Sequence, residues 1–105
     1  MFAVVASYDR FMNLDKLSKA VNYLCREQGP RVHFIATNED VSFPLKPGEI
    51  TLGAGIVSTA LTRATGRLPL VMGKPCRPMW KYICQRSAGQ GKKIEPGRTL
   101  MVGDR

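Results

Sequence analysis

The chain has 105 residues and a mass of 11.6 kDa, which is enough for one domain with one modest hydrophobic core. Hydrophobic residues make up 44% and charged residues 23%, and these values exclude a disordered or collagen-like chain. The net charge of +8 arises in residues 63–105, where ten basic side chains stand against two acidic ones, whereas residues 1–62 hold six of each.

This charge distribution suits nucleic acid, a phosphorylated ligand or an acidic partner segment. Apart from Lys92-Lys93, the basic residues are spread singly along the chain, so we expect no nucleic-acid partner. No apolar run approaches the ~20 residues that span a bilayer, so we expect no membrane partner. The N-terminus lacks the basic leader of a signal peptide. The three cysteines form no CxxC pair, which indicates free thiols, a reducing compartment and a cytoplasmic location.

The N-terminal part of the sequence predicts a strand, a helix and a second strand in that order. Residues 2–7 are a valine-rich apolar run and predict a buried strand. Apolar residues then recur at steps of three and four over residues 13–28, where Asn13 caps a predicted helix and a Gly-Pro pair ends it. Residues 31–36 return as a second strand. This order is a βαβ unit and predicts an α/β fold with a parallel sheet.

The rest of the sequence predicts a loop, two helices and two further strands. Residues 41–51 contain two prolines and a glycine and are predicted as a long loop. A second helix is predicted over residues 53–65, a third strand over residues 68–72 and a short helix over residues 78–87. A last strand is predicted over residues 99–102. The short helix is expected to bury three large side chains, which are Met79, Trp80 and Ile83.

Polar residues follow three of the predicted strands, at the sheet edge where ligands bind in open α/β folds. Residues 37–40 (Thr-Asn-Glu-Asp) follow the second strand, and Lys74 follows the third strand in a turn fixed by Gly73 and Pro75. Asp104 follows the last strand. A cation and a carboxylate at one edge are typical of a phosphate-and-metal site, although a solvated lysine and an ordinary turn aspartate stay open as alternatives.

Two glycine-containing segments match known phosphate-binding loops only in part. In Gly53-x-Gly55-x-x-Ser58 a serine replaces the third glycine of a dinucleotide fingerprint. We interpret this segment as a helix start that needs close backbone approach, with N–H groups that could still face an anion. The segment that ends in Gly73-Lys74 is no P-loop, because its glycine spacing is wrong and a proline replaces the Ser or Thr that would hold magnesium. His33 lies within a strand and is interpreted as structural.

Taken together, these segments resemble the haloacid dehalogenase superfamily of phosphatases. The resemblance is to the phosphoglycolate phosphatase, 4-nitrophenylphosphatase and pyridoxal phosphate phosphatase (chronophin) group. Gly73-Lys74-Pro75 and the run from Ile94 to Arg105 (Ile-x-Pro-x-Arg-Thr-Leu-Met-Val-Gly-Asp-Arg) resemble the last two motifs of the family. Thr37-Asn38-x-Asp40 and Gly53-x-Gly55 resemble its large α/β cap. The resemblance implies a βαβ-type cap domain over residues 1–67, followed by part of a Rossmann-like catalytic core over residues 68–105.

The resemblance implies hydrolysis of a small phosphorylated metabolite, in which an Asp attacks phosphorus while Mg²⁺ and a lysine neutralise the transferring group. Lys74 matches the catalytic lysine, and Asp104 matches a Mg²⁺ ligand. Phe43 stands where pyridoxal phosphatases have a histidine, which argues against pyridoxal phosphate as the preferred substrate. The cap positions that match substrate-binding residues are Asn38, Asp40, Phe43, Gly53 and Gly55.

The chain departs from the family in its nucleophile. Family members carry an Asp-x-Asp-x-Gly motif before the cap, but no two Asp residues of this chain are separated by one residue. We find no counterpart of the family's Ser/Thr motif either. The chain is therefore expected to be an internal piece that is inactive alone. The alternative that stays open is a non-catalytic cap fragment, acting as an interaction module or as a homodimer through the cap.

Overall fold

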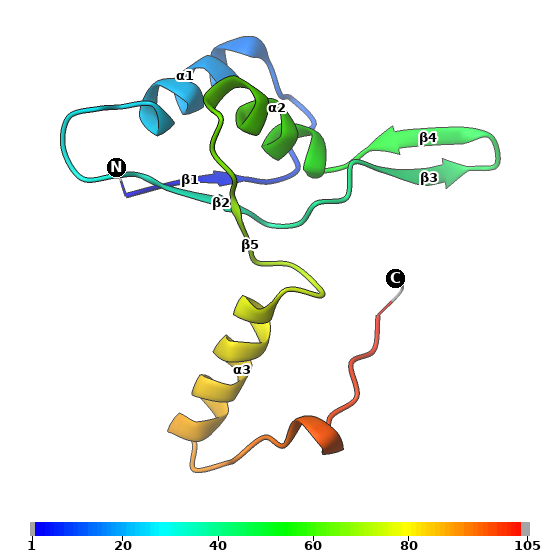
Figure 1. Ribbon diagram of the computed structural model, residues 1–105. Coiled ribbons are helices and arrows are strands. Elements are labelled where there is room, and N and C mark those ends of the chain that lie inside the picture. The colour runs from blue at the N-terminus through cyan, green and yellow to red at the C-terminus, as the bar shows by residue number, and fades with distance from the viewer. Residues whose placement is uncertain (1, 104–105) are drawn as a thin grey trace.

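Three short parallel strands form the central sheet in the computed structural model, which describes residues 2–103 (Figure 1). The strands are β1 (Ala3–Ala6), β2 (His33–Ala36) and β5 (Leu70–Val71), and β2 lies between the other two. Both pairings are parallel, which confirms the sheet expected from the βαβ order. All three strands therefore end at the same edge, which is the edge where α/β sheets bind ligands.

Two helices cover one face of this sheet. The first helix, α1 (Leu14–Leu24), begins where the Asn13 side chain accepts a 3.0 Å hydrogen bond from the Lys16 amide, as expected of an N-cap. It ends earlier than predicted because the residues after Cys25 are charged or polar and exposed, so a longer helix would bury nothing more. The second helix, α2 (Gly55–Thr65), ends at Gly66, whose φ of 68° is the left-handed cap conformation that glycine favours.

The hydrophobic core lies between the two helices and the sheet. Full burial of a Val, Leu or Phe side chain in this core stabilises the fold by about 1.5–3 kcal/mol. Arg67 closes one end of this core, since its guanidinium donates hydrogen bonds of 2.7 Å to the Leu24 carbonyl and 2.6 Å to the Val32 carbonyl. It thereby ties the end of α1 to the segment before β2. The core residues are Ala6, Leu24, Val32, Phe34, Val57 and Leu61.

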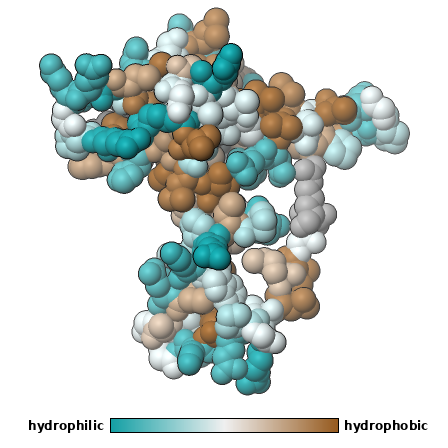
Figure 2. All heavy atoms as spheres, viewed as in Figure 1, coloured by the Kyte–Doolittle hydropathy of each residue, from teal (hydrophilic) through white to brown (hydrophobic). Residues whose placement is uncertain are grey.

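The opposite face of the sheet carries apolar side chains that no described helix covers. Val5, Ile35 and Leu70 lie in one row across the three strands, and Val5 and Leu70 are 58% and 56% exposed. Figure 2 shows apolar atoms gathered on the lower side of the sheet layer, where the chain leads toward the C-terminal segment. We call Val5, Ile35 and Leu70 the open sheet face.

The predicted loop over residues 41–51 is wrong, because this segment forms an antiparallel hairpin. Its strands are β3 (Ser42–Lys46) and β4 (Glu49–Leu52), which project away from the central sheet (Figure 1). Pro47 and Gly48 connect them, and the φ of 79° at Gly48 suits a type II turn with proline before glycine. The prolines and the glycine therefore marked a tight turn and an irregular strand rather than a long loop.

The C-terminal part also differs from the prediction. The helix α3 (Arg77–Gly89) is present and hangs away from the sheet layer, but none of its residues is buried, so Met79, Trp80 and Ile83 do not form a core (Figure 1). The expected strand over residues 99–102 is absent from the structure of residues 2–103. The last described part, residues 92–103, holds only a short 3₁₀ helix, Pro96–Arg98. Leu100 and Val102 are 84% and 80% exposed, because no neighbouring strand is there to pair with them.

Candidate functional site

The ends of the three parallel strands bring three loops together. Ser7 follows β1, the loop of residues 37–40 follows β2, and Gly73 follows β5. The Thr37 hydroxyl donates a 3.2 Å hydrogen bond to the Ser7 hydroxyl, and the Met72 amide donates one of 2.9 Å to the Ala36 carbonyl. These bonds continue the register of the strands into the loops and fix the loops side by side.

Gly73 touches the start of the 37–40 loop so closely that no side chain would fit. A Cβ at Gly73 would lie 2.5 Å from the Thr37 carbonyl oxygen and 3.2 Å from the Asn38 Cβ. The Cys76 amide donates a 2.9 Å hydrogen bond to the Gly73 carbonyl and closes the turn that holds Lys74. The lysine turn therefore lies directly against the 37–40 loop.

Gly53 and Gly55 touch the other end of the same loop. A Cβ at Gly53 would lie 2.1 Å from the Asp40 carbonyl oxygen, and one at Gly55 would lie 2.4 Å from the Glu39 carbonyl oxygen. This confirms the interpretation of the segment as a helix start that needs close backbone approach. The amides of Gly53 and Gly55 donate to the Val41 and Asp40 carbonyls at 2.8 and 2.9 Å, so these two N–H groups do not face an anion.

Asn38 lies within this junction. Its Oδ1 atom is buried and has no hydrogen-bond partner among residues 2–103. A buried acceptor without a donor costs about 1–3 kcal/mol. A role in a functional site is one explanation for such a group in a native structure.

The structure brings together most of the predicted site. Asn38, Asp40, Gly53 and Gly55 form one packed unit, and the turn that holds Lys74 adjoins it. Phe43 lies apart in β3 and is 37% exposed. Asp104 falls outside the described residues. Sequence analysis missed Ser7, although the strand-end rule that selected the 37–40 loop applies equally to the residue after β1.

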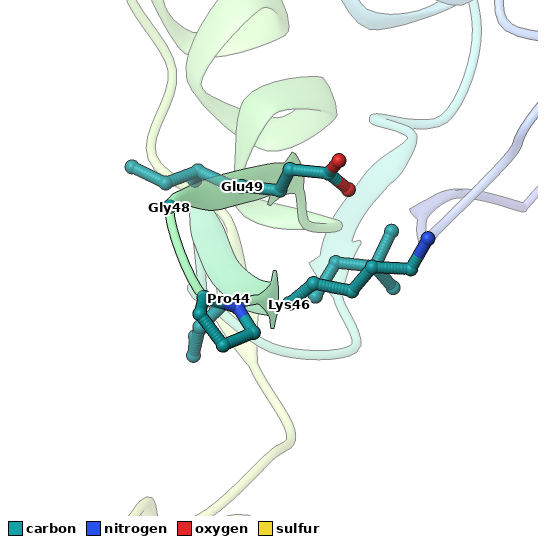
Figure 3. Close-up of a pocket in the computed structure, with 7 residues that line it drawn as sticks. Pro44, Lys46, Gly48 and Glu49 are labelled. Carbon is teal, nitrogen blue, oxygen red and sulfur yellow. The ribbon is translucent and has the colours of Figure 1, made fainter.

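The hairpin carries a shallow hollow near its tip. Figure 3 shows Pro44, Lys46, Gly48 and Glu49 around it, with the charged ends of Lys46 and Glu49 on the same side. The hollow is formed by one hairpin alone, lined by residues 44–50. None of its lining residues is a predicted site residue, although Phe43 lies in the same hairpin.

One ion pair shapes the loop between β1 and α1. The Lys16 ammonium lies 2.6 Å from an Asp9 carboxylate oxygen, and the Phe11 amide donates to the other oxygen at 2.8 Å. The hydrogen bond from Lys16, followed by that from the Phe11 amide, holds the pKa of Asp9 below its ordinary value. Asp9 is therefore a charged partner of Lys16 at neutral pH.

Residues 2–103 contain no group of three His, Cys, Asp or Glu side chains that could hold a metal ion. The three cysteines are free, as the sequence predicted. Within the part of the chain that the structure describes, no helix is long and apolar enough to cross a membrane.

Comparisons with known proteins define the class to which this arrangement is similar. No protein-family model matches the chain. A Caenorhabditis elegans protein that carries the NipSnap name (K02D10.1) is 43% identical over 98% of this chain and 18% of its own length. Bovine chronophin is 39% identical over 98% of this chain and 32% of its own length. Chicken glycerol-3-phosphate phosphatase is 35% identical, with 98% and 31% covered.

Solved structures agree with the sequence relatives. The 4-nitrophenylphosphatase of Thermotoga maritima has a TM-score of 0.71 and 30% identity, covering 98% of this chain and 36% of that chain. The glycerol phosphate phosphatase of Mycobacterium tuberculosis, in complex with calcium, has a TM-score of 0.67 and 26% identity, covering 82% and 24%. The fold is thus that of part of a phosphatase of the haloacid dehalogenase type. The chain is a homologue of chronophin and glycerol-3-phosphate phosphatase and spans about a third of their length.

Proposed function

We propose that these residues form the cap, over residues 1–67, and the start of the catalytic core, over residues 68–105, of a phosphomonoester hydrolase. The observation that carries the proposal is the contact between the Lys74 turn and the 37–40 loop at the ligand-binding edge of the sheet. The Lys74 ammonium would neutralise charge on the transferring phosphoryl group. The 37–40 loop and the hairpin that holds Phe43 would shape the space for the leaving group.

The proposed substrate is a small phosphorylated metabolite. The names of the phosphatase relatives support this class, and Phe43 in place of a histidine disfavours pyridoxal phosphate. Magnesium enters the proposal through the resemblance, in which Asp104 matches a Mg²⁺ ligand. A cytoplasmic location likewise remains a prediction from the free thiols.

The proposal expects no turnover from these 105 residues alone, because no Asp-x-Asp pair is present to supply the nucleophile. We would assay the purified chain with 4-nitrophenyl phosphate and magnesium and expect a rate at background. Magnesium-dependent turnover that Lys74→Ala abolishes would contradict this expectation.

The function itself is tested in a chimera. These 105 residues would replace the matching segment of the Thermotoga maritima 4-nitrophenylphosphatase, which they cover over 98% of their length. We expect the chimera to hydrolyse 4-nitrophenyl phosphate and Lys74→Ala to remove at least ~100-fold of that rate. Lys81→Ala, on the exposed side of α3, is the matched control. A folded chimera with no turnover, or with full turnover after Lys74→Ala, would refute the proposal.

A second candidate function rests on the open sheet face. Parallel sheets are nearly always covered on both faces, so exposed Val5 and Leu70 favour a surface that meets another polypeptide. This supports the alternative of an interaction module, whose homodimer would form through the cap strands β1 and β2 together with the adjoining β5. Sedimentation velocity should show a dimer that Val5→Thr together with Leu70→Thr dissociates. A chain that is still monomeric at about 100 µM would rule out this candidate, because a dimer with a Kd of ~100 µM is already weak.

A further inference from the structure

The 37–40 loop is held at both ends by contacts between backbone atoms. Gly73 meets the Thr37 carbonyl oxygen at the start of the loop, with a Cβ distance of 2.5 Å. Gly55 meets the Glu39 carbonyl oxygen at the other end, with a Cβ distance of 2.4 Å. A carbonyl oxygen cannot rotate away as a side chain can, so a shift of either segment must move the loop itself.

This close packing belongs to the junction and is not general to the glycines of the chain. Gly89, which lies in α3, and Gly97 meet no atom within 4 Å of an added Cβ among the described residues. Gly73 and Gly55 are also buried, whereas Gly89 and Gly97 are exposed. The chain therefore supplies its own pair of matched control positions.

One hydrogen bond ties the loop to the start of α2, and two others hold the backbone where the loop leaves β2. The Gly55 amide donates to the Asp40 carbonyl at 2.9 Å, and the Thr37 amide donates to the Ala6 carbonyl at 3.0 Å. The Met72 amide, one residue before Gly73, donates to the Ala36 carbonyl at 2.9 Å. The path from the start of α2 to the Lys74 turn thus consists of packed and hydrogen-bonded backbone, with Asn38 enclosed in its middle.

We propose that Gly55 is a positioning residue for Lys74, which it reaches through the 37–40 loop, and that it does not contact the substrate. A displacement at the start of α2 or at the hairpin joined to it would be passed through the loop to the lysine turn. The catalytic meaning of this coupling rests on the proposed function. The coupling itself is a property of the 105 residues and can be measured without any turnover.

The coupling is tested by NMR on the ¹⁵N-labelled chain. Gly55→Ala should shift the amide resonances of Gly73 and Lys74 as well as those of residues 38–40, whereas Gly89→Ala should shift neither group. In the reverse direction, Gly73→Ala should shift the amides of Gly53 and Gly55, because coupling between two sites is reciprocal. Shifts confined to residues 38–40 and to the mutated segment would overturn the proposal.

A variant that adds no atom guards against loss of the fold. Asn38→Gly should loosen the loop and raise the amide mobility of Lys74 and Gly55 together, since both are held through it. Unchanged mobility at either residue would overturn the coupling. In the chimera, Gly55→Ala should lower kcat by about 10-fold or more with KM little changed, because a misplaced catalytic group costs rate rather than binding. A raised KM with unchanged kcat would instead make Gly55 a substrate contact.

The two proposals fail in different ways. Coupled NMR shifts in a chain whose chimera is inactive would retain the positioning link and refute the phosphatase. An active chimera in which Gly55→Ala leaves the amides of Gly73 and Lys74 unshifted would retain the phosphatase and refute the link.

Discussion

The carbonyl oxygen of Thr37 lies 2.5 Å from the point that a Cβ on Gly73 would occupy. Thr37 directly follows β2, the second strand of the βαβ unit, and Gly73 precedes the lysine of the Gly-Lys-Pro turn. This contact joins a segment that resembles a substrate-specifying cap to a segment that resembles a phosphate-binding core. The contact also makes the stability of the sheet edge depend on Gly73 having no side chain.

Gly73→Ala is therefore expected to destabilise the chain by about 1–3 kcal/mol, the usual range for an overpacked buried position. The backbone of Thr37 must shift to admit the methyl group, which weakens the pairing of β2 with β5. Urea denaturation measures the change. Gly97→Ala, at an open position, is the control and should change the free energy of unfolding by less than about 0.5 kcal/mol. Equal values for the two variants would contradict the contact.

Lys74 and Asp104 should fail differently in the active chimera. Lys74→Ala should lower turnover at saturating magnesium, because it removes a charge-stabilising group. Asp104→Asn should instead weaken magnesium affinity, since it removes a hard anionic oxygen. A magnesium titration of the rate separates the two effects. Rescue of Lys74→Ala by excess magnesium, without rescue of Asp104→Asn, would reverse the assigned roles.

The Asp9–Lys16 ion pair should contribute to the acid limb of the stability curve. The pKa of Asp9 is lowered in the folded chain, so its contribution is complete above the pKa of the unfolded chain and is lost as pH falls through the folded pKa. The pair is solvent-exposed, so the effect should be small. Asp9→Asn should flatten the acid limb of urea denaturation midpoints measured from pH 7 to pH 3. Asp15→Asn, in the first turn of α1, is the control. An unchanged acid limb in Asp9→Asn would contradict the role of the pair.

Arg67 should be important for the stability of residues 1–67. Arg67→Ala leaves the Leu24 and Val32 carbonyls without the hydrogen bonds that they now accept at 2.7 and 2.6 Å. Each hydrogen bond to a charged group is worth about 1.5–3 kcal/mol, so the loss should lower the thermal midpoint by several degrees or more. Arg63→Ala, an exposed arginine of the same segment, is the control. Equal midpoints for the two variants would show that the bonds contribute nothing.

The sequence was sufficient for elements that local chemistry decides. The valine-rich run before Ser7, the cap at Asn13 and the glycine stop at Gly66 each fixed a boundary through one or two residues. The strand-end rule also selected the 37–40 loop and the Lys74 turn, each after its own strand, and both lie at the edge where β2 and β5 end.

The errors arose where pairing decides the structure. The hairpin was hidden because Pro44 and Pro47 resemble a loop, although a bulge and a tight turn accommodate both. The apolar run from Leu100 to Val102 has strand-like composition but no described strand beside it. The composition of a segment does not show whether a neighbouring element is present. For the same reason it did not show that the face of α3 with Trp80 is not buried. The contacts of Gly53, Gly55 and Gly73 with the 37–40 loop were also hidden in the sequence, because they join segments far apart in the chain.

Hydrogen exchange should distinguish the central sheet from the C-terminal residues 100–102. The amides of β2 lie in the middle strand of the sheet and beneath the core, so they should exchange slowly, with β1 next. Residues 100–102 have exposed side chains and no regular structure, so their amides should exchange within the first time points. The central position of β2 also means that Leu70→Pro, which blocks the pairing of β5, should speed exchange in β2 while leaving α1 slow. Equal protection in β2 and in residues 100–102 would contradict this division, because it would require a strand partner for the C-terminal run that the described residues do not provide.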